Sequence, residues 1–163
     1  MADHSDAVVA QWREQRPDLD PSPMATFTRL WRAARLVEER QAAVFSAHGL
    51  EAGWFDVLAT LRRAGAPHRL SAGTLARGLV MSTGGMTKRL DKLEAAGLVA
   101  RSPDPDDRRG VLVSLTEHGL AVVDRAVEDH LDNEARLLEP LTERERRALN
   151  GALAKLVAAW EAT

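Results

Sequence analysis

The chain has 163 residues, which is enough for one domain with its own hydrophobic core, or for one domain and a small appendage. Its composition, 45% hydrophobic and 28% charged, is that of an ordinary globular protein, and no apolar run is long enough to span a bilayer. The acidic start lacks the basic residues and apolar core of a signal peptide, so we expect a cytoplasmic protein. The absence of cysteine excludes disulfides, thiolate metal ligands and thiol catalysis.

Charge is unevenly distributed along the chain. Residues 62–114 contain ten Lys or Arg against five Asp or Glu, whereas the segments on either side are both net acidic. A basic middle between acidic ends favours a polyanionic partner such as nucleic acid. The alternative is a chance excess of arginine, and the charge alone does not decide between the two.

The N-terminal part of the chain predicts helices over residues 5–15, 22–48 and 51–64. Ser5 and Ser22 are the expected N-caps of the first two, because a hydroxyl oxygen can accept a hydrogen bond from a free backbone N–H of the first turn. Two prolines separate these helices, and a glycine follows the second and the third, which is typical of helix ends.

The middle of the chain predicts a winged helix. Ser71 is expected to cap a short helix, and Ser82 to cap a second one over residues 83–96 after a tight turn. Two short helices joined by a tight turn, the second richer in small polar and basic residues, form the helix-turn-helix pattern. Aliphatic and β-branched residues then predict strands over 98–101 and 111–115, joined by a loop.

The C-terminal part predicts two more helices. Thr116 can cap one that reaches about Leu138, and Thr142 with Glu145 forms a capping box for a last helix through Trp160. An apolar stripe follows this last helix, at Leu149, Leu153, Leu156, Val157 and Trp160. Such a stripe either packs internally or forms a dimer interface, and a two-fold dimer suits a module that binds palindromic DNA.

The expected fold is therefore mainly α (α+β), a winged helix-turn-helix with flanking dimerisation helices. Residues 1–20 would form an extra N-terminal helix. Residues 22–50 and 116–163 would form the helical dimerisation region. Residues 51–115 would form the DNA-binding lobe.

The stretch around the predicted wing resembles the MarR family (multiple antibiotic resistance regulators). Its most specific part is Asp-Pro-Asp-Asp-Arg-Arg-Gly at 104–110, followed by the second strand and Leu-Thr-Glu-His-Gly at 115–119. The spacing of Asp106 and Arg108 matches the family's wing hallmark. The resemblance covers residues 24–160, and it implies a homodimeric regulator, in the first place a repressor, that binds a palindromic operator.

The wing carries the first group of expected DNA contacts. Arg108 and Arg109 would enter the minor groove, where arginine responds to the enhanced negative potential, and Asp106 would orient a guanidinium through a bidentate pair. The alternative is a solvated loop whose arginines pair with its own acids.

The second of the two short helices carries the other group. Ser82, Thr83, Thr87 and Lys88 lie near its N-terminal end, which would enter the major groove. Hydroxyl and ammonium groups there suit phosphates or base edges.

A finer resemblance, to the urate-responsive branch of the family, rests on the extra N-terminal helix and four residues. Trp12 would form an aromatic wall, Arg63 and Arg89 would hold an anion, and Asp56 would accept hydrogen bonds or repel the anion until the helices shift. Since Asp56 lies among apolar neighbours, we expect this helix face to be partly buried. The best candidate ligand is urate or a related purine, and a polycarboxylate is the alternative.

Each of these four residues also has a structural interpretation. Trp12 can pack a terminal helix, Asp56 with Arg63 can form a salt bridge, and Arg89 can contact a phosphate. A DNA-binding protein without an effector therefore stays open as a second hypothesis.

We expect no cofactor, no metal and no catalytic residue. The five histidines lack ligand spacing, although a zinc site assembled across a dimer stays an alternative. No glycine-rich phosphate loop, nucleophile elbow or carboxylate dyad is present, which leaves an enzyme as the remotest hypothesis. The expected partners are double-stranded operator DNA, a second copy of the chain and a small anionic effector, with no membrane.

Overall fold

The computed structural model describes residues 3–107 and 110–162. The chain forms two compact units, Met1–Ala43 and Val44–Thr163. The first unit contains α1 (His4–Gln15) and most of α2 (Ser22–Ala47). The second contains the end of α2 and then α3 (Trp54–Arg63), β1 (Arg69–Ser71), α4 (Ala72–Gly78), α5 (Thr83–Ala95), β2 (Val99–Pro103), β3 (Val111–Leu115), α6 (Glu117–Leu138) and α7 (Glu143–Glu161). None of the described helices is both long and apolar enough to cross a bilayer.

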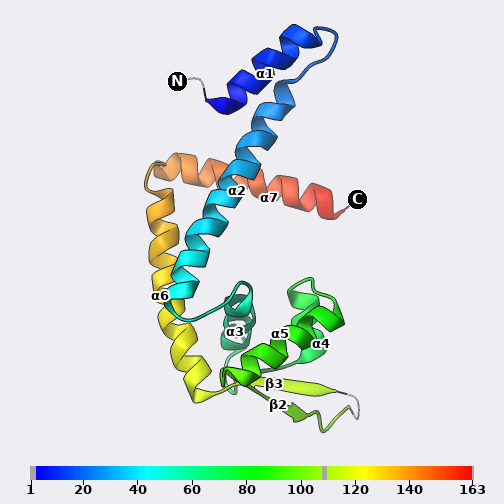
Figure 1. Ribbon diagram of the computed structural model, residues 1–163, viewed down its shortest axis with the longest axis vertical. Helices are drawn as coiled ribbons and strands as arrows, with labels where there is room; N and C mark the ends of the chain where they lie inside the picture. Colours follow the sequence, from blue (N-terminus) through cyan, green and yellow to red (C-terminus); the bar gives the residue numbers. More distant parts are fainter. Residues whose placement is uncertain (1–2, 108–109, 163) are drawn as a thin grey trace. The chain divides into compact units, whose positions relative to one another are not determined.

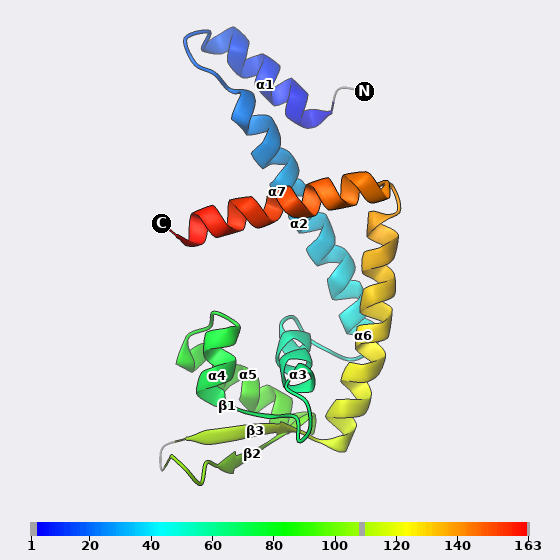
Figure 2. The same ribbon diagram turned by 180° about the vertical axis from the view of Figure 1, so that it is seen from behind.

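The only sheet among the described residues has three antiparallel strands in the order β1-β3-β2. Ala100 of β2 and Arg69 of β1 both lie opposite Ser114 of β3, on its two sides. The helices α3, α4 and α5 lie on the same side of this sheet (Figure 1, Figure 2). The predicted hairpin and helix-turn-helix are confirmed, and β1 was not predicted because three residues are too short for a recognisable alternation.

A single hydrophobic core holds the second unit together. Its fully buried side chains come from the helices α3 to α6 and from the strands β2 and β3, and include Leu58, Leu61, Leu75, Met86, Leu90, Leu93, Val113 and Val123. Burying one such side chain stabilises the fold by roughly 1.5–3 kcal/mol. Since α5 contributes three of them at a helical spacing, its orientation is fixed by the core and its other face is left outside.

The start of α6 packs directly on the backbone at the beginning of β2. Thr116 is its N-cap, and the Thr116 hydroxyl accepts a hydrogen bond from Gly119 N at 2.9 Å and donates one to Gly97 O at 2.7 Å. A Cβ atom placed on Gly119 would lie only 1.9 Å from Leu98 O. Residue 119 must therefore be glycine for the helix to approach the strand this closely.

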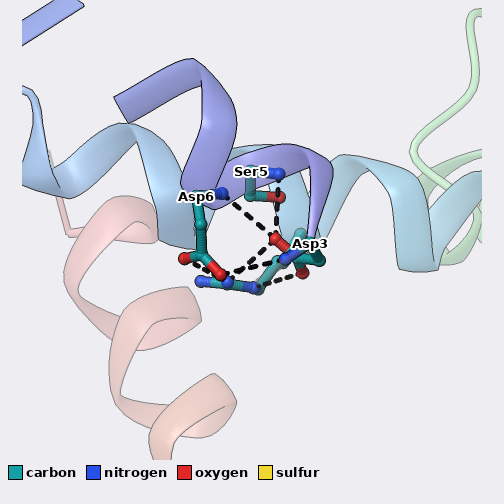
Figure 3. Close-up of polar contacts among 4 residues, drawn as sticks. Asp3, Ser5 and Asp6 are labelled. Carbon is teal, nitrogen blue, oxygen red and sulfur yellow. Dashed lines mark hydrogen bonds and ion pairs between the residues drawn. The ribbon is translucent and has the colours of Figure 1, made fainter. Parts of the chain in front are cut away.

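The N-terminal unit is held by an ion-pair cluster. Asp3 is the N-cap of α1, and its carboxylate accepts hydrogen bonds from Ser5 N and Asp6 N at 2.8 and 3.1 Å (Figure 3). Arg29 of α2 donates to Asp3 twice, at 2.9 Å each, and to Asp6 at 2.7 Å. These contacts, with Arg29 the strongest, hold the pKa of Asp3 at about 2, below its ordinary value of 3.8. The expectation that Ser5 caps this helix is wrong, because the carboxylate of Asp3 takes that role.

Other helix boundaries differ by a few residues from the prediction. Ser22 is the first residue of α2 rather than its cap, and its backbone N donates to the Asp20 carboxylate at 3.0 Å. The third helix begins at Trp54 instead of residue 51, because Gly53 adopts a left-handed conformation with φ +76° that interrupts the helix. The caps Ser71, Ser82, Thr116 and Thr142 are confirmed.

The close packing of α6 on β2 predicts that Gly119→Ala destabilises the protein by about 3 kcal/mol, at the upper end of ordinary overpacking, because the methyl group meets backbone that cannot move aside. The matched control is Gly84→Ala in α5, where a Cβ atom has no neighbour within 4 Å. That control should gain about 0.5–1 kcal/mol from helix propensity. Urea unfolding measures both, and equal midpoints would contradict the packing argument.

The ion-pair cluster predicts that Arg29→Gln speeds amide hydrogen exchange over α1 by about threefold to fivefold, since an isolated helix of 12 residues is marginal in water. Arg35→Gln, which removes the exposed pair with Glu39 within α2, is the control and should leave α1 unchanged. In the parent, the folded-state pKa of Asp3 is depressed, so its contribution is present above pH 4 and is lost as the pH falls from about 4 to about 2. An unchanged protection factor for the α1 amides across that range, taken against the intrinsic exchange rate at each pH, would contradict the assignment.

Candidate nucleic-acid interface

The N-terminal end of α5 presents polar groups to solvent. Ser82 is in an extended conformation and its Oγ accepts a hydrogen bond from Gly85 N at 3.2 Å, which caps the helix. Thr83, Thr87 and Lys88 are exposed, and the Thr87 hydroxyl donates to Thr83 O at 3.0 Å. Free backbone N–H groups at a helix N-terminus, together with hydroxyls and an ammonium, form a surface suited to phosphate oxygens and base edges.

The turn between α4 and α5 exposes an apolar residue, Val80, that was not predicted to be part of this surface. Val80 is 95% exposed and has φ +51°, a left-handed conformation that costs a β-branched residue about 1–3 kcal/mol. The turn is closed by the hydrogen bond from Met81 N to Ala76 O at 2.8 Å. An apolar residue in a turn gives no sequence signal for exposure, because valine is most often buried.

The described part of the wing is organised by its own backbone. Asp104 N donates to Gly110 O at 3.0 Å, Gly110 N to Asp107 O at 2.8 Å, and Asp106 N to the Asp104 carboxylate at 3.0 Å. Arg108 and Arg109 lie outside the described residues. The roles predicted for them, and for Asp106 as the residue that orients a guanidinium, therefore stay predictions.

The residues of the predicted ligand site are distributed over both units. Trp12 lies on α1 in the N-terminal unit and is 44% exposed. Asp56 and Arg63 lie on α3, and both are exposed, so the expected partial burial of this face is wrong. The reason is that the apolar neighbours of Asp56 point to the opposite face of α3, into the core. In the described part of the chain Asp56 and Arg63 do not pair with each other. Instead Arg63 donates to the Thr60 hydroxyl at 3.1 Å.

Arg89 connects the candidate recognition helix to the segment before α3. Its Nη1 donates to Gly53 O at 3.3 Å and to Met81 Sδ at 3.1 Å, and the side chain is partly buried. Lys92, one turn along α5, pairs with Glu51 at 2.7 Å. Two cations of α5 therefore hold the α2–α3 connection.

A hollow of about 230 Å³ opens beside this connection, lined by Glu51, Ala52, Trp54, Gly85, Lys88, Arg89 and Lys92. Lys92 was not predicted as part of a site, since its pairing with Glu51 depends on the tertiary fold. Among the described residues no group of three or more acidic or histidine side chains has a metal-binding arrangement.

The comparisons with known proteins agree with this geometry. Residues 48–110 match the sequence profile of the MarR family. The chain is 42% identical over 149 residues to the HTH-type transcriptional regulator PecS of Dickeya dadantii, covering 91% of this chain and 90% of that protein. The chain belongs to the MarR family. It is a DNA-binding transcriptional regulator of this type, and the enzyme hypothesis is excluded because the matching family and relative are transcriptional regulators.

Solved structures show the same architecture. A mutant MarR of Escherichia coli, crystallised with operator DNA, superposes with a TM-score of 0.73 at 27% identity and covers 89% of this chain and 96% of that one. AbsC of Streptomyces coelicolor has a TM-score of 0.80 at 22% identity, covering 89% and 98%. The winged-helix fold expected from the resemblance to the MarR family is thereby confirmed.

Proposed function

We propose that the protein is a homodimeric repressor in the cytoplasm that binds a palindromic operator and releases it when a small anion binds. The observation that supports DNA binding most directly is the exposed N-terminal end of α5, with Ser82, Thr83, Thr87 and Lys88 on one open surface. These residues would contact the major groove. Arg108 and Arg109 at the wing, oriented by Asp106, would contact the minor groove.

A second copy of the chain is the partner that the terminal helices favour. The apolar stripe of α7 is between 36% and 53% exposed at each of Leu149, Leu153, Leu156, Val157 and Trp160. In the N-terminal unit, Phe27 and Trp31 of α2 are 40% and 69% exposed, with ring centroids 6.0 Å apart. Several large apolar side chains exposed along one helix, as in each unit taken by itself, are typical of an interface. A two-fold dimer would present two α5 helices to half-sites roughly 10 bp apart.

Arg89 supports the link between effector and DNA. It lies on α5, and its guanidinium bonds both to Gly53 O in the segment before α3 and to Met81 Sδ just before the helix begins. An anion that attracted Arg89 away from Gly53 O would change how α5 is held. A ligand acts only if it binds one of two arrangements better, and a residue with two alternative partners provides this difference.

The effector itself is proposed from the resemblance to the urate-responsive branch, with Trp12, Asp56, Arg63 and Arg89 as the binding residues. Exposed Arg63 and Asp56, without an ion pair between them in the described chain, leave both charges available for a ligand. A polycarboxylate or no effector remains the alternative. A purine effector predicts that a purine stabilises the protein, whereas a polycarboxylate effector or the absence of an effector predicts that no purine does.

The DNA-binding proposal predicts that Lys88→Ala and Arg109→Ala each weaken binding and lower the salt slope, the change in log K with log salt concentration, by about one unit. The duplex would be one selected by the parent protein from a random pool. Lys155→Ala on α7 is the charge-matched control and should bind like the parent. If Lys88→Ala keeps both the affinity and the slope of the parent, α5 does not contact phosphate through this residue.

The effector proposal predicts a rise in unfolding temperature with urate that hypoxanthine, citrate and salicylate do not produce. At about 100 times its dissociation constant, a ligand stabilises the folded state by about 2.7 kcal/mol. Trp12→Phe and Arg63→Gln should reduce this shift, whereas Arg69→Gln, at an exposed arginine of β1, should not. A shift with citrate alone would replace the purine by a polycarboxylate, and no shift with any compound would remove the effector.

A further inference from the structure

We propose that Arg101 is a positioning residue that fixes the wing to the recognition helix, and that operator binding requires it although it contacts no DNA. This inference rests on the proposed use of α5 and the wing as the two DNA-contacting elements. Arg101 would control the angle between α5 and the wing hairpin.

Arg101 is the third residue of β2 and bonds to two carboxylates of α5. Its Nε and Nη2 donate to Glu94 Oε2 at 2.9 and 2.6 Å, and its Nη1 donates to Asp91 Oδ1 at 2.7 Å. The backbone N of Arg101 donates to Glu94 Oε1 at 3.0 Å. Asp91 and Glu94 are three residues apart, so they share one face of the helix. In the described part of the chain, these are the only side-chain hydrogen bonds between α5 and β2.

The position of Arg101 along β2 explains why this contact can control the direction of the hairpin. The beginning of β2 is already held, because Leu98 N donates to Leu93 O at 3.0 Å and Val99 is buried. Beyond Arg101, Ser102 and Pro103 are exposed and pair only with β3. Among the described residues of the hairpin, Arg101 is therefore the last one toward the wing tip whose side chain bonds to α5. Without it, β2 is bonded to α5 only at its base, and the part of the hairpin beyond Leu112, where the pairing of β3 with β1 ends, is held less firmly.

The electrostatics of this contact argue against a direct role in DNA binding. The Arg101 side chain is 28% exposed and its fork is occupied by two acids. Hydrogen bonding to Arg101 lowers the pKa of Glu94, and hydrogen bonding to Glu94 raises the pKa of Arg101, so both groups stay charged and paired. A guanidinium already neutralised in this way has little charge to offer a phosphate.

The geometry requires arginine rather than any cation. Two carboxylates are reached at once by a planar fork with donors at fixed angles, whereas lysine is a point charge on a flexible stem. Two DNA contacts made by one rigid body reinforce each other, because the second forms at a high effective concentration. A loose wing loses that reinforcement on the selected operator, and it loses less on DNA that is bound without a fixed register.

The experiment compares Arg101→Lys and Glu94→Gln with the parent, on a duplex selected by the parent from a random pool and on a mixed-sequence duplex of equal length. Each variant should weaken binding to the selected duplex by about tenfold and to the mixed-sequence duplex by less than about threefold, with the salt slope of the parent retained. A variant that is partly unfolded would bind both duplexes more weakly by the same factor. The ratio of the two affinities therefore distinguishes a loss of wing positioning from a loss of folded protein.

Two outcomes would overturn the proposal. Glu94→Gln removes a negative charge from α5, so tighter binding of both duplexes would show that the acid only repels DNA. An Arg101→Lys protein with the parent's affinity ratio would show that charge alone suffices. Lys88→Ala, measured on the same duplexes, separates this failure from failure of the proposed interface, since only in the latter case does it bind like the parent.

Discussion

The buried face of α5 is the constraint on which the rest of the second unit depends. Met86, Leu90 and Leu93 insert into the core beside side chains from α3, β3 and α6, and each is 2% exposed or less. Because these three positions fix the rotation of the helix about its own axis, they determine which residues face solvent. The exposed end of α5, the connection through Arg89 and the fastening of the wing through Arg101 all follow from that one orientation.

Ion pairs then add contacts between elements, both in the N-terminal unit and around the core of the second unit. Arg29 links α2 to α1, Arg62 links α3 to Asp124 of α6 at 2.7 Å, and Arg101 links β2 to α5. Each arginine lies far along the chain or on a different element from its partner, which suits a long side chain with several fixed donors. Exposed pairs of this kind add little free energy singly. Their effect is to choose one arrangement of elements that are already folded.

Most of the fold could be predicted from the sequence because its signals are local. Caps such as Ser71 and Ser82, and the capping box of Thr142 with Glu145, depend only on residues three or four positions apart. The errors arose where the deciding partner is remote. Asp3 rather than Ser5 caps α1 in contact with Arg29, twenty-six positions away, and Asp56 is exposed because its neighbours, not it, face the core. The hydrogen bonds of Arg101 could not be predicted either, because its partners lie on another element.

The residues that cap and anchor α5 are different from those exposed at its N-terminal end, and this has an evolutionary consequence. Thr83, Thr87 and Lys88 contribute nothing to the hydrophobic core, and the N-cap of the helix is Ser82. Substitutions at these three exposed positions should therefore change folding stability little, in the range of ordinary surface replacements. Sequence preference at this surface can drift, or be redesigned by exchanging a few side chains, while the scaffold that carries it stays the same.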